Sequence, residues 1–98
     1  MPNESDPQAY RQYETMKILY FAWLREKIGL SEETLELPDT VNDVAGLLGW
    51  LKTRGPEFVS ALKDDAVIRV AVNQIHAQPH TTIRPADEVA LFPPVTGG

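Results

Sequence analysis

A single helix-periodic segment between short strand-like segments most constrains the fold of this chain. After Asp39 and Thr40, both candidate N-caps, apolar residues recur at the 3.6-residue spacing of a helix. These residues are Val41, Val44, Ala45, Leu47, Leu48 and Leu51. The pattern predicts an amphipathic helix over residues 41–53, ended by Gly55-Pro56. Its apolar stripe must be buried against the face of a sheet.

The segments around this helix are short and typical of strands. Residues 16–23 are β-branched and aromatic, and residues 24–29 suit a helical turn ended by Gly29. Further strands are expected over 34–37, 67–72, 75–78 and 88–92, and a second short helix within 57–65. This order predicts an α+β roll, with a mixed sheet packed on one main helix.

The chain divides into an extension and one domain. Residues 1–15 are polar and contain two prolines, so we interpret them as a mobile N-terminal extension. Residues 16–98 form the predicted domain, with a flexible C-terminal tail over 93–98.

Composition excludes several classes of function. The formal charge of -5 argues against nucleic-acid binding, which depends on lysine and arginine. No apolar run is long enough to span a membrane. The chain has no cysteine, which removes thiol chemistry and fits a cytoplasmic location. Any sulfur that this protein carries must therefore be held elsewhere than on a side-chain thiol.

Side-chain catalysis and metal binding have little support in the sequence. The only histidines, His76 and His80, are separated by Pro79 in a region of strand and loop, so no metal site is expected. The carboxylate pairs Glu32-Glu33 and Asp64-Asp65 resemble solvated turns. We therefore expect that the chain is not an enzyme on its own and binds no permanent cofactor.

The C-terminal segment Phe92-Pro93-Pro94-Val95-Thr96-Gly97-Gly98 has a different character. Two terminal glycines are compatible with simple fraying. They also leave the terminal carboxylate unhindered and allow the chain to enter a narrow channel. The two prolines would stiffen the base of a tail whose last four residues span about 13 Å when extended. Such a tail suits delivery of a terminal acyl group into a pocket of another protein.

Three stretches resemble the small subunit of molybdopterin synthase. They are residues 19–26 (LYFAWLRE), residues 70–74 (VAVNQ) and residues 87–98 (DEVALFPPVTGG). The resemblance implies a β-grasp (ubiquitin-like) fold. It also implies that an activating enzyme uses ATP to adenylate the carboxylate of Gly98, and that a sulfur donor converts it to a thiocarboxylate. The sulfur would then pass to cyclic pyranopterin monophosphate in the large subunit, within a heterotetramer, to form molybdopterin.

The resemblance also implies roles for individual residues. Gly98 would carry the sulfur, and Gly97 would provide clearance in the channel of the partner. The partner-binding residues would be Phe21, Arg25, Leu91, Phe92, Pro93, Pro94, Val95 and Thr96. Phe21 and Phe92 have core packing as an alternative, and Arg25 could simply face solvent.

Three alternative functions stay open at this level. The chain could deliver sulfur for thiazole synthesis or another thiocarboxylate pathway. It could be a ubiquitin-like modifier joined to lysines through Gly98. It could also be a binding module in which the glycines have no role.

Overall fold

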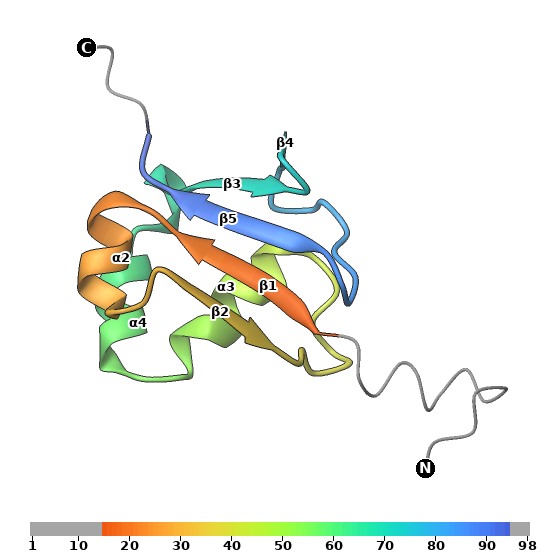
Figure 1. The fold of residues 1–98 in the computed structure, drawn as a ribbon, viewed down its shortest axis with the longest axis horizontal. Helices are drawn as coiled ribbons and strands as arrows, with labels where there is room; N and C mark the ends of the chain where they lie inside the picture. Colours follow the sequence, from red (N-terminus) through yellow and green to blue (C-terminus); the bar gives the residue numbers. More distant parts are fainter. Residues whose placement is uncertain (1–14, 95–98) are drawn as a thin grey trace, which may run out of the picture.

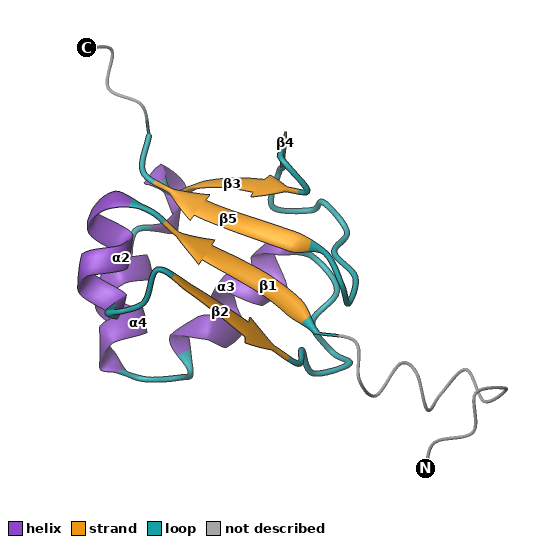
Figure 2. Cartoon of the chain, in the orientation of Figure 1, coloured by secondary structure: helices purple, strands orange, loops and turns teal. Residues whose placement is uncertain are grey.

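The computed structural model describes residues 15–94, which form one mixed sheet with helices on one face (Figures 1 and 2). In chain order the elements are β1 (Met16–Tyr20), α2 (Ala22–Ile28), β2 (Glu32–Leu35), α3 (Val44–Lys52), α4 (Pro56–Leu62), a 3-10 turn η1 (Asp65–Val67), β3 (Arg69–Val72), β4 (Ile75–His76) and β5 (Glu88–Phe92). The strand order is β2-β1-β5-β3-β4. Strands β1 and β5 are parallel, and the other neighbours are antiparallel. The predicted α+β roll is confirmed.

Strand alternation divides the sheet into a buried and an uncovered face. In β1, Met16, Ile18 and Tyr20 point into the core, and in β5 Val89 and Leu91 do the same. The helices close this face with buried apolar side chains, which are Leu24, Ile28, Leu47, Leu51, Phe58 and Leu62. Burial of each such side chain contributes roughly 1.5–3 kcal/mol. Helix α3 is the longest of them and corresponds to the predicted main helix, and α2 and α4 cover the same face beside it.

The first strand is shorter than predicted. It ends at Tyr20, because the N–H of Leu24 already bonds to the carbonyl of Phe21 at 3.1 Å and starts α2. Ala22, the first residue of α2, has φ of 55°, in the left-handed region. The prediction that the strand extends to residue 23 is therefore wrong.

The main helix begins at Val44, and Asp43 is its N-cap instead of the predicted Asp39 or Thr40. The Oδ1 atom of Asp43 accepts a hydrogen bond from the N–H of Gly46 at 2.7 Å. Residues 42–44 form backbone bonds with residues 81–83, which keeps them extended and delays the helix. Gly55-Pro56 does not end this helix. Instead, Pro56 is the first residue of α4, where a backbone N–H would have no partner within the helix, so the missing N–H of proline costs nothing.

The remaining boundaries shift for similar reasons. Strand β2 covers residues 32–35 instead of 34–37, and η1 delays β3 until Arg69. The predicted turn at Asn73-Gln74 is confirmed, with both residues at positive φ. Residues 75–76 alone form β4, so that strand is shorter than the predicted 75–78.

Most of the predicted extension over 1–15, and residues 95–98 of the predicted tail, lie outside the described residues. None of the helices in residues 15–94 is long and apolar enough to cross a membrane.

Candidate functional site

The last described residues leave the centre of the sheet. Strand β5 has β1 on one side and β3 on the other. Leu91 is in register with Tyr20 and with Val70, and Phe92 is in register with Arg69. Pro93 and Pro94 follow directly and cannot donate to a strand neighbour, which ends the ladder. The segment Phe92-Pro93-Pro94, which we call the tail base, therefore continues a strand that is paired with β1 up to Leu91 and with β3 up to Phe92.

The tail base borders the sheet face that the helices of residues 15–94 leave uncovered, here called the outer face (Figure 2). The strand registers place on it Lys17, Leu19, Arg69, Ala71, His76, Glu88, Ala90 and Phe92. Ala71, Ala90 and Phe92 are half-buried there, although no helix of the described part of the chain packs over them. This face is therefore a candidate surface for a partner.

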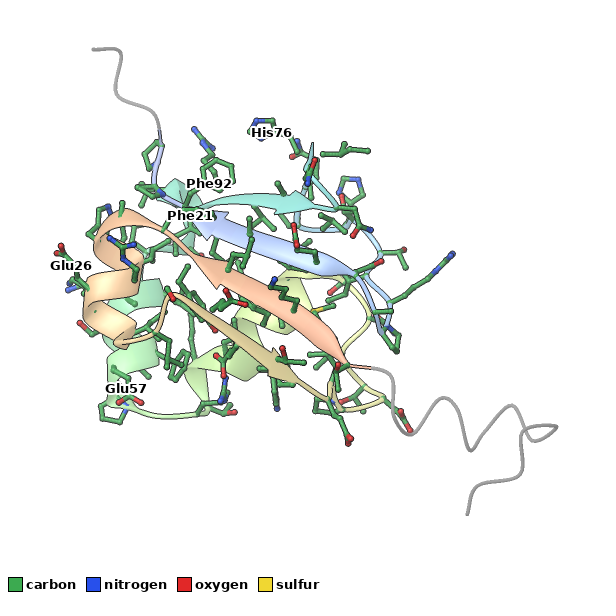
Figure 3. All side chains as sticks on the ribbon, viewed as in Figure 1. Phe21, Glu26, Glu57, His76 and Phe92 are labelled. Atoms are coloured by element: carbon green, nitrogen blue, oxygen red, sulfur yellow. The ribbon has the colours of Figure 1, made fainter. Side chains whose placement is uncertain are left out.

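Three aromatic residues, Phe21, His76 and Phe92, lie at or near the tail base (Figure 3). The side chain of Phe21 is 46% exposed, and its N–H donates to the carbonyl of Leu91 at 3.1 Å. The ring of His76 meets that of Phe92 edge-on, with centroids 5.8 Å apart. We call Phe21, His76 and Phe92 the aromatic patch. The core alternative for Phe21 does not hold, because the side chain lies at the surface.

Leu91 is a correction to the predicted site. Its side chain is completely buried between the sheet and the helices. Adjacent residues of a strand point to opposite faces, so a half-buried outer Phe92 requires an inward Leu91. The prediction that Leu91 contacts a partner is therefore wrong, and its role is to hold β5 in the core.

The other predicted contact residues lie at different places in the chain. Arg25 is exposed on α2 and, within residues 15–94, forms no ion pair, so its role in partner binding stays a prediction. Pro93 and Pro94 are half-buried at the tail base. The predictions for Val95, Thr96, Gly97 and Gly98 lie outside the described residues.

A polar cluster that the sequence did not reveal lies under the same end of the sheet. The carboxylate of Glu33 accepts hydrogen bonds from the hydroxyl of Tyr20 at 2.6 Å and from Nη1 of Arg54 at 2.7 Å. The guanidinium of Arg54 lies over the ring of Phe58, 4.8 Å from its centroid. Glu33 is thus a tertiary contact of β2, not part of a solvated turn as predicted.

The cluster shifts the pKa values of its members. Burial of the Tyr20 hydroxyl, with Glu33 as its acceptor, raises the pKa of Tyr20. Burial alone would raise the pKa of Glu33, but the hydrogen bonds from Arg54 and Tyr20 outweigh it and lower that pKa. Hydrogen bonding to Glu33 raises the pKa of Arg54. The cluster therefore keeps its charges and fastens β1, β2 and the α3–α4 connection together.

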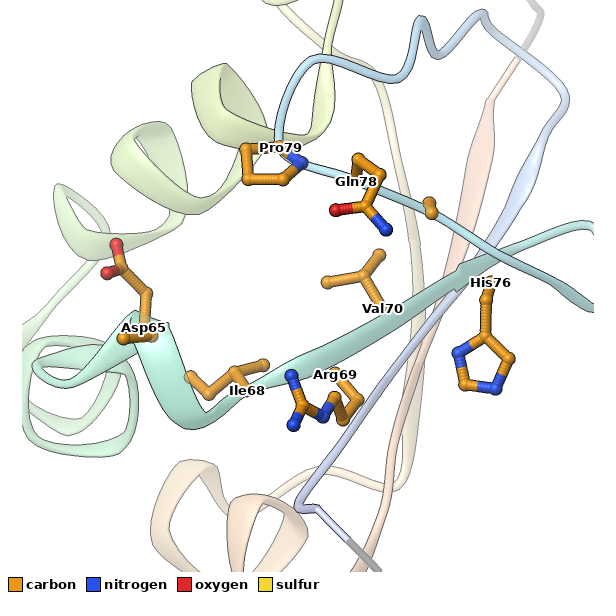
Figure 4. Close-up of a pocket in the computed structure, with 9 residues that line it drawn as sticks. Asp65, Ile68, Arg69, Val70, His76, Gln78 and Pro79 are labelled. Carbon is orange, nitrogen blue, oxygen red and sulfur yellow. The ribbon is translucent and has the colours of Figure 1, made fainter.

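An open pocket of about 460 Å³ lies beside β3, beyond the end of β4 (Figure 4). Its lining includes Asp65, Arg69, Val70, His76 and Pro79. The carboxylate of Asp65 is paired with Nζ of Lys52 at 3.0 Å, so it is not poised for catalysis. In residues 15–94, no group of three or more histidine, aspartate or glutamate side chains could hold a metal ion.

Comparison with known proteins assigns the chain to a family. A model of the ThiS family matches residues 18–98. The chain belongs to the ThiS family. It is 32% identical over 83 residues to the molybdopterin synthase sulfur carrier subunit of Haemophilus influenzae, covering 85% of this chain and 99% of that protein. It is 35% identical to the subunit of the same name from Chlamydomonas reinhardtii, covering 85% and 98%.

Solved structures of related proteins support the fold of this ThiS-family chain. The crystal structure of SAMP1, small archaeal modifier protein 1, from Haloferax volcanii aligns with a TM-score of 0.69 at 31% identity, covering 86% of this chain and 99% of that one. The predicted β-grasp fold and the predicted resemblance to molybdopterin synthase small subunits are confirmed.

Proposed function

We propose that this chain is the sulfur carrier subunit of molybdopterin synthase. The observation that carries the proposal is the tail base: a central strand, held on both sides, leads directly into the Pro-Pro segment and then toward Gly97-Gly98. The similarity to sulfur carrier subunits extends over nearly their whole length. The chain is then a carrier whose chemistry is completed on other proteins in the cytoplasm.

The proposed chemistry takes place on the main-chain terminus. The Gly98 carboxylate attacks ATP on the activating enzyme, which forms an acyl-adenylate and releases pyrophosphate. A sulfur donor then displaces AMP and leaves a thiocarboxylate. Because the chain has no cysteine, the terminus is the position at which it can hold reactive sulfur. The thiocarboxylate sulfur is finally transferred to cyclic pyranopterin monophosphate in the large subunit.

The folded body would dock the tail in the large subunit. The aromatic patch is exposed beside the tail base, and aromatic residues often dominate the binding energy of interfaces. Docking through this patch would place the start of the tail at the interface, so that residues 95–98 could extend into the pocket of the partner. Two such carriers and two central large subunits would form the heterotetramer.

Mass spectrometry and reconstitution test the proposal. After co-expression with the activating enzyme and a sulfur source, the intact mass should rise by the difference between one sulfur and one oxygen atom. The thiocarboxylated protein, mixed with the large subunit and cyclic pyranopterin monophosphate, should then yield molybdopterin. Absence of product with a fully thiocarboxylated protein would refute this function and favour the thiazole or another thiocarboxylate pathway.

A modifier function is the second candidate, because SAMP1 carries that name and shares the fold at 31% identity. It predicts covalent conjugates of the chain, through Gly98, in extracts of its own organism. Immunoblots with and without deletion of Gly98 would detect them.

A further inference from the structure

An uncompensated cation lies next to Phe92 on the outer face. Arg69 is in register with Phe92 across β3 and β5, so the two side chains share a face and are neighbours. Arg69 is exposed and, within residues 15–94, takes part in no ion pair or side-chain hydrogen bond. Its guanidinium carries a permanent positive charge in a chain whose net charge is -5.

The lysine on the opposite half of the outer face is paired, in contrast to Arg69. There Nζ of Lys17 lies 3.3 Å from the carboxylate of Glu32, and Lys17 is also in register with Glu88. Strands β1 and β5 are parallel, so these residues lie at the end of the sheet far from the tail base. The outer face therefore has its unpaired positive charge only at the tail end, among the residues that the structure describes.

The surface around Arg69 is also concave. Strand β4 pairs with residues 71 and 72 of β3 but not with Arg69, and the open pocket lies along this part of β3. Arg69 and His76 lie on one side of β3, and Gln78 and Pro79 on the other (Figure 4). A partner side chain can therefore approach the guanidinium without displacing a neighbouring strand.

We propose that Arg69 selects the binding surface of the large subunit by pairing with a carboxylate that borders the apolar pocket for Phe92. This inference rests on the proposed function and concerns specificity, not the sulfur chemistry. A carboxylate on the partner would be repelled by the net negative charge of this chain and attracted to the guanidinium of Arg69, which is the unpaired arginine on the outer face of the described residues. The pairing therefore favours the docking orientation that brings the tail toward the large subunit.

His76 is a positioning residue in the same arrangement. Its ring packs edge-on against Phe92, and its backbone is in register with Ala71. The contact restricts the motion of the Phe92 ring on the side of that ring that faces away from β1. The aromatic contact, not the polar atoms of His76, should thus matter for binding.

Binding titrations with the purified large subunit of the same organism test this inference. Arg69→Glu should weaken binding by about tenfold or more, and Arg69→Gln should weaken it less. The matched control is Arg84→Glu, which makes the same charge change on an exposed residue in the loop before β5, at the other end of the sheet. Arg84→Glu should change the dissociation constant by less than about twofold. Added salt should reduce the difference in dissociation constant between the wild type and Arg69→Glu. Loss of structure alone would not make that difference depend on salt.

The His76 variants separate packing from polarity. His76→Ala should weaken binding by about threefold or more, whereas His76→Phe should restore it.

Two results would overturn the inference in distinguishable ways. If the wild type binds and Arg69→Glu and Arg84→Glu have equal effects, the Arg69 pairing is wrong while the proposed function stands. If the wild type shows no binding to the large subunit, the proposed function fails and this inference fails with it.

Discussion

Glu33 shows how strongly the tertiary neighbours of one residue decide its behaviour. Its position in Ser31-Glu32-Glu33 suggests a solvated surface carboxylate. In the fold, the inward Tyr20 hydroxyl and the Arg54 guanidinium both donate to it. Charge-assisted hydrogen bonds are stronger than neutral ones, so the ionised form is the stabilising one.

This cluster predicts a pH-dependent stability. The pKa of Glu33 is lower in the fold than its ordinary value of 4.5. The contribution is therefore fully present above pH 4.5 and is lost as the pH falls through the folded-state pKa. Glu33→Gln should lower the free energy of unfolding at neutral pH by about 1 kcal/mol, and this difference should shrink in acid.

Urea unfolding of both proteins across this pH range provides the measurement. Glu36→Gln, at an exposed position after β2, is the matched control and should have little effect at any pH. A constant difference between wild type and Glu33→Gln down to strongly acidic pH would contradict the assignment.

At the scale of elements, β5 assigns separate tasks to adjacent residues. Leu91 is completely buried, whereas Phe92 lies half-buried on the outer face beside His76. The period of two in a strand is the physical reason. We therefore expect that stability and the proposed partner binding can be separated within one strand.

Paired alanine variants test this separation. Leu91→Ala should lower the free energy of unfolding by roughly 2–5 kcal/mol, because it leaves a cavity in the core. Phe92→Ala should change stability much less but should weaken binding of the large subunit by about 2 kcal/mol or more.

Chemical denaturation and calorimetric titration would give the two quantities. Val59→Ala, on the exposed surface of α4, is the control for loss of an exposed apolar side chain and should leave binding unchanged. Equal effects of Phe92→Ala and Val59→Ala on binding would exclude Phe92 as an anchor.

The start of α3 gives a second test at this scale. Asp43→Ala removes the hydrogen bond to the N–H of Gly46 and should cost about 1 kcal/mol of stability. Asp39→Ala, at the exposed position that the sequence favoured as a cap, should cost little. Thermal melts of the two variants distinguish them, and a larger loss for Asp39→Ala would show that the helix starts earlier.

For the whole molecule, the buried core of the described residues ends where the tail base begins. The core extends from Met16 to Leu91, and the sheet anchors the chain up to Phe92. Because β1 and β5 are parallel, residue 15 and residue 94 lie at opposite ends of the sheet (Figure 1). The described core is thus complete before the proposed carrier tail begins.

Deletion of Gly98 should abolish sulfur loading while the domain stays folded. The core of the described residues is complete at Leu91, and terminal residues usually contribute little to stability, so the melting temperature should match that of the wild type within error. Intact mass after co-expression with the activating enzyme would report loading, and a melt would report folding. Sulfur loading at wild-type level in the deletion variant would place the chemistry elsewhere.

Local patterns in the sequence were sufficient for several elements and for the proposed carrier role. The helical period around Leu47 and Leu51, the Asn73-Gln74 turn and the prolines after Phe92 act over a few residues, so they are visible in the sequence. The exact ends of the helices and strands were harder to predict from the sequence. Residues 42–44 stay extended because they pair with residues 81–83, which are distant in the chain.

The sequence by itself determined that this chain forms an α+β roll whose last strand leads into a Pro-Pro-x-x-Gly-Gly ending. Only the tertiary structure decided that Leu91 is core, that Glu33 is held by Tyr20 and Arg54, and that Arg69 and His76 flank Phe92. The physical reason is that these properties depend on contacts between strands far apart in sequence, which are set by sheet register and not by local residue preference.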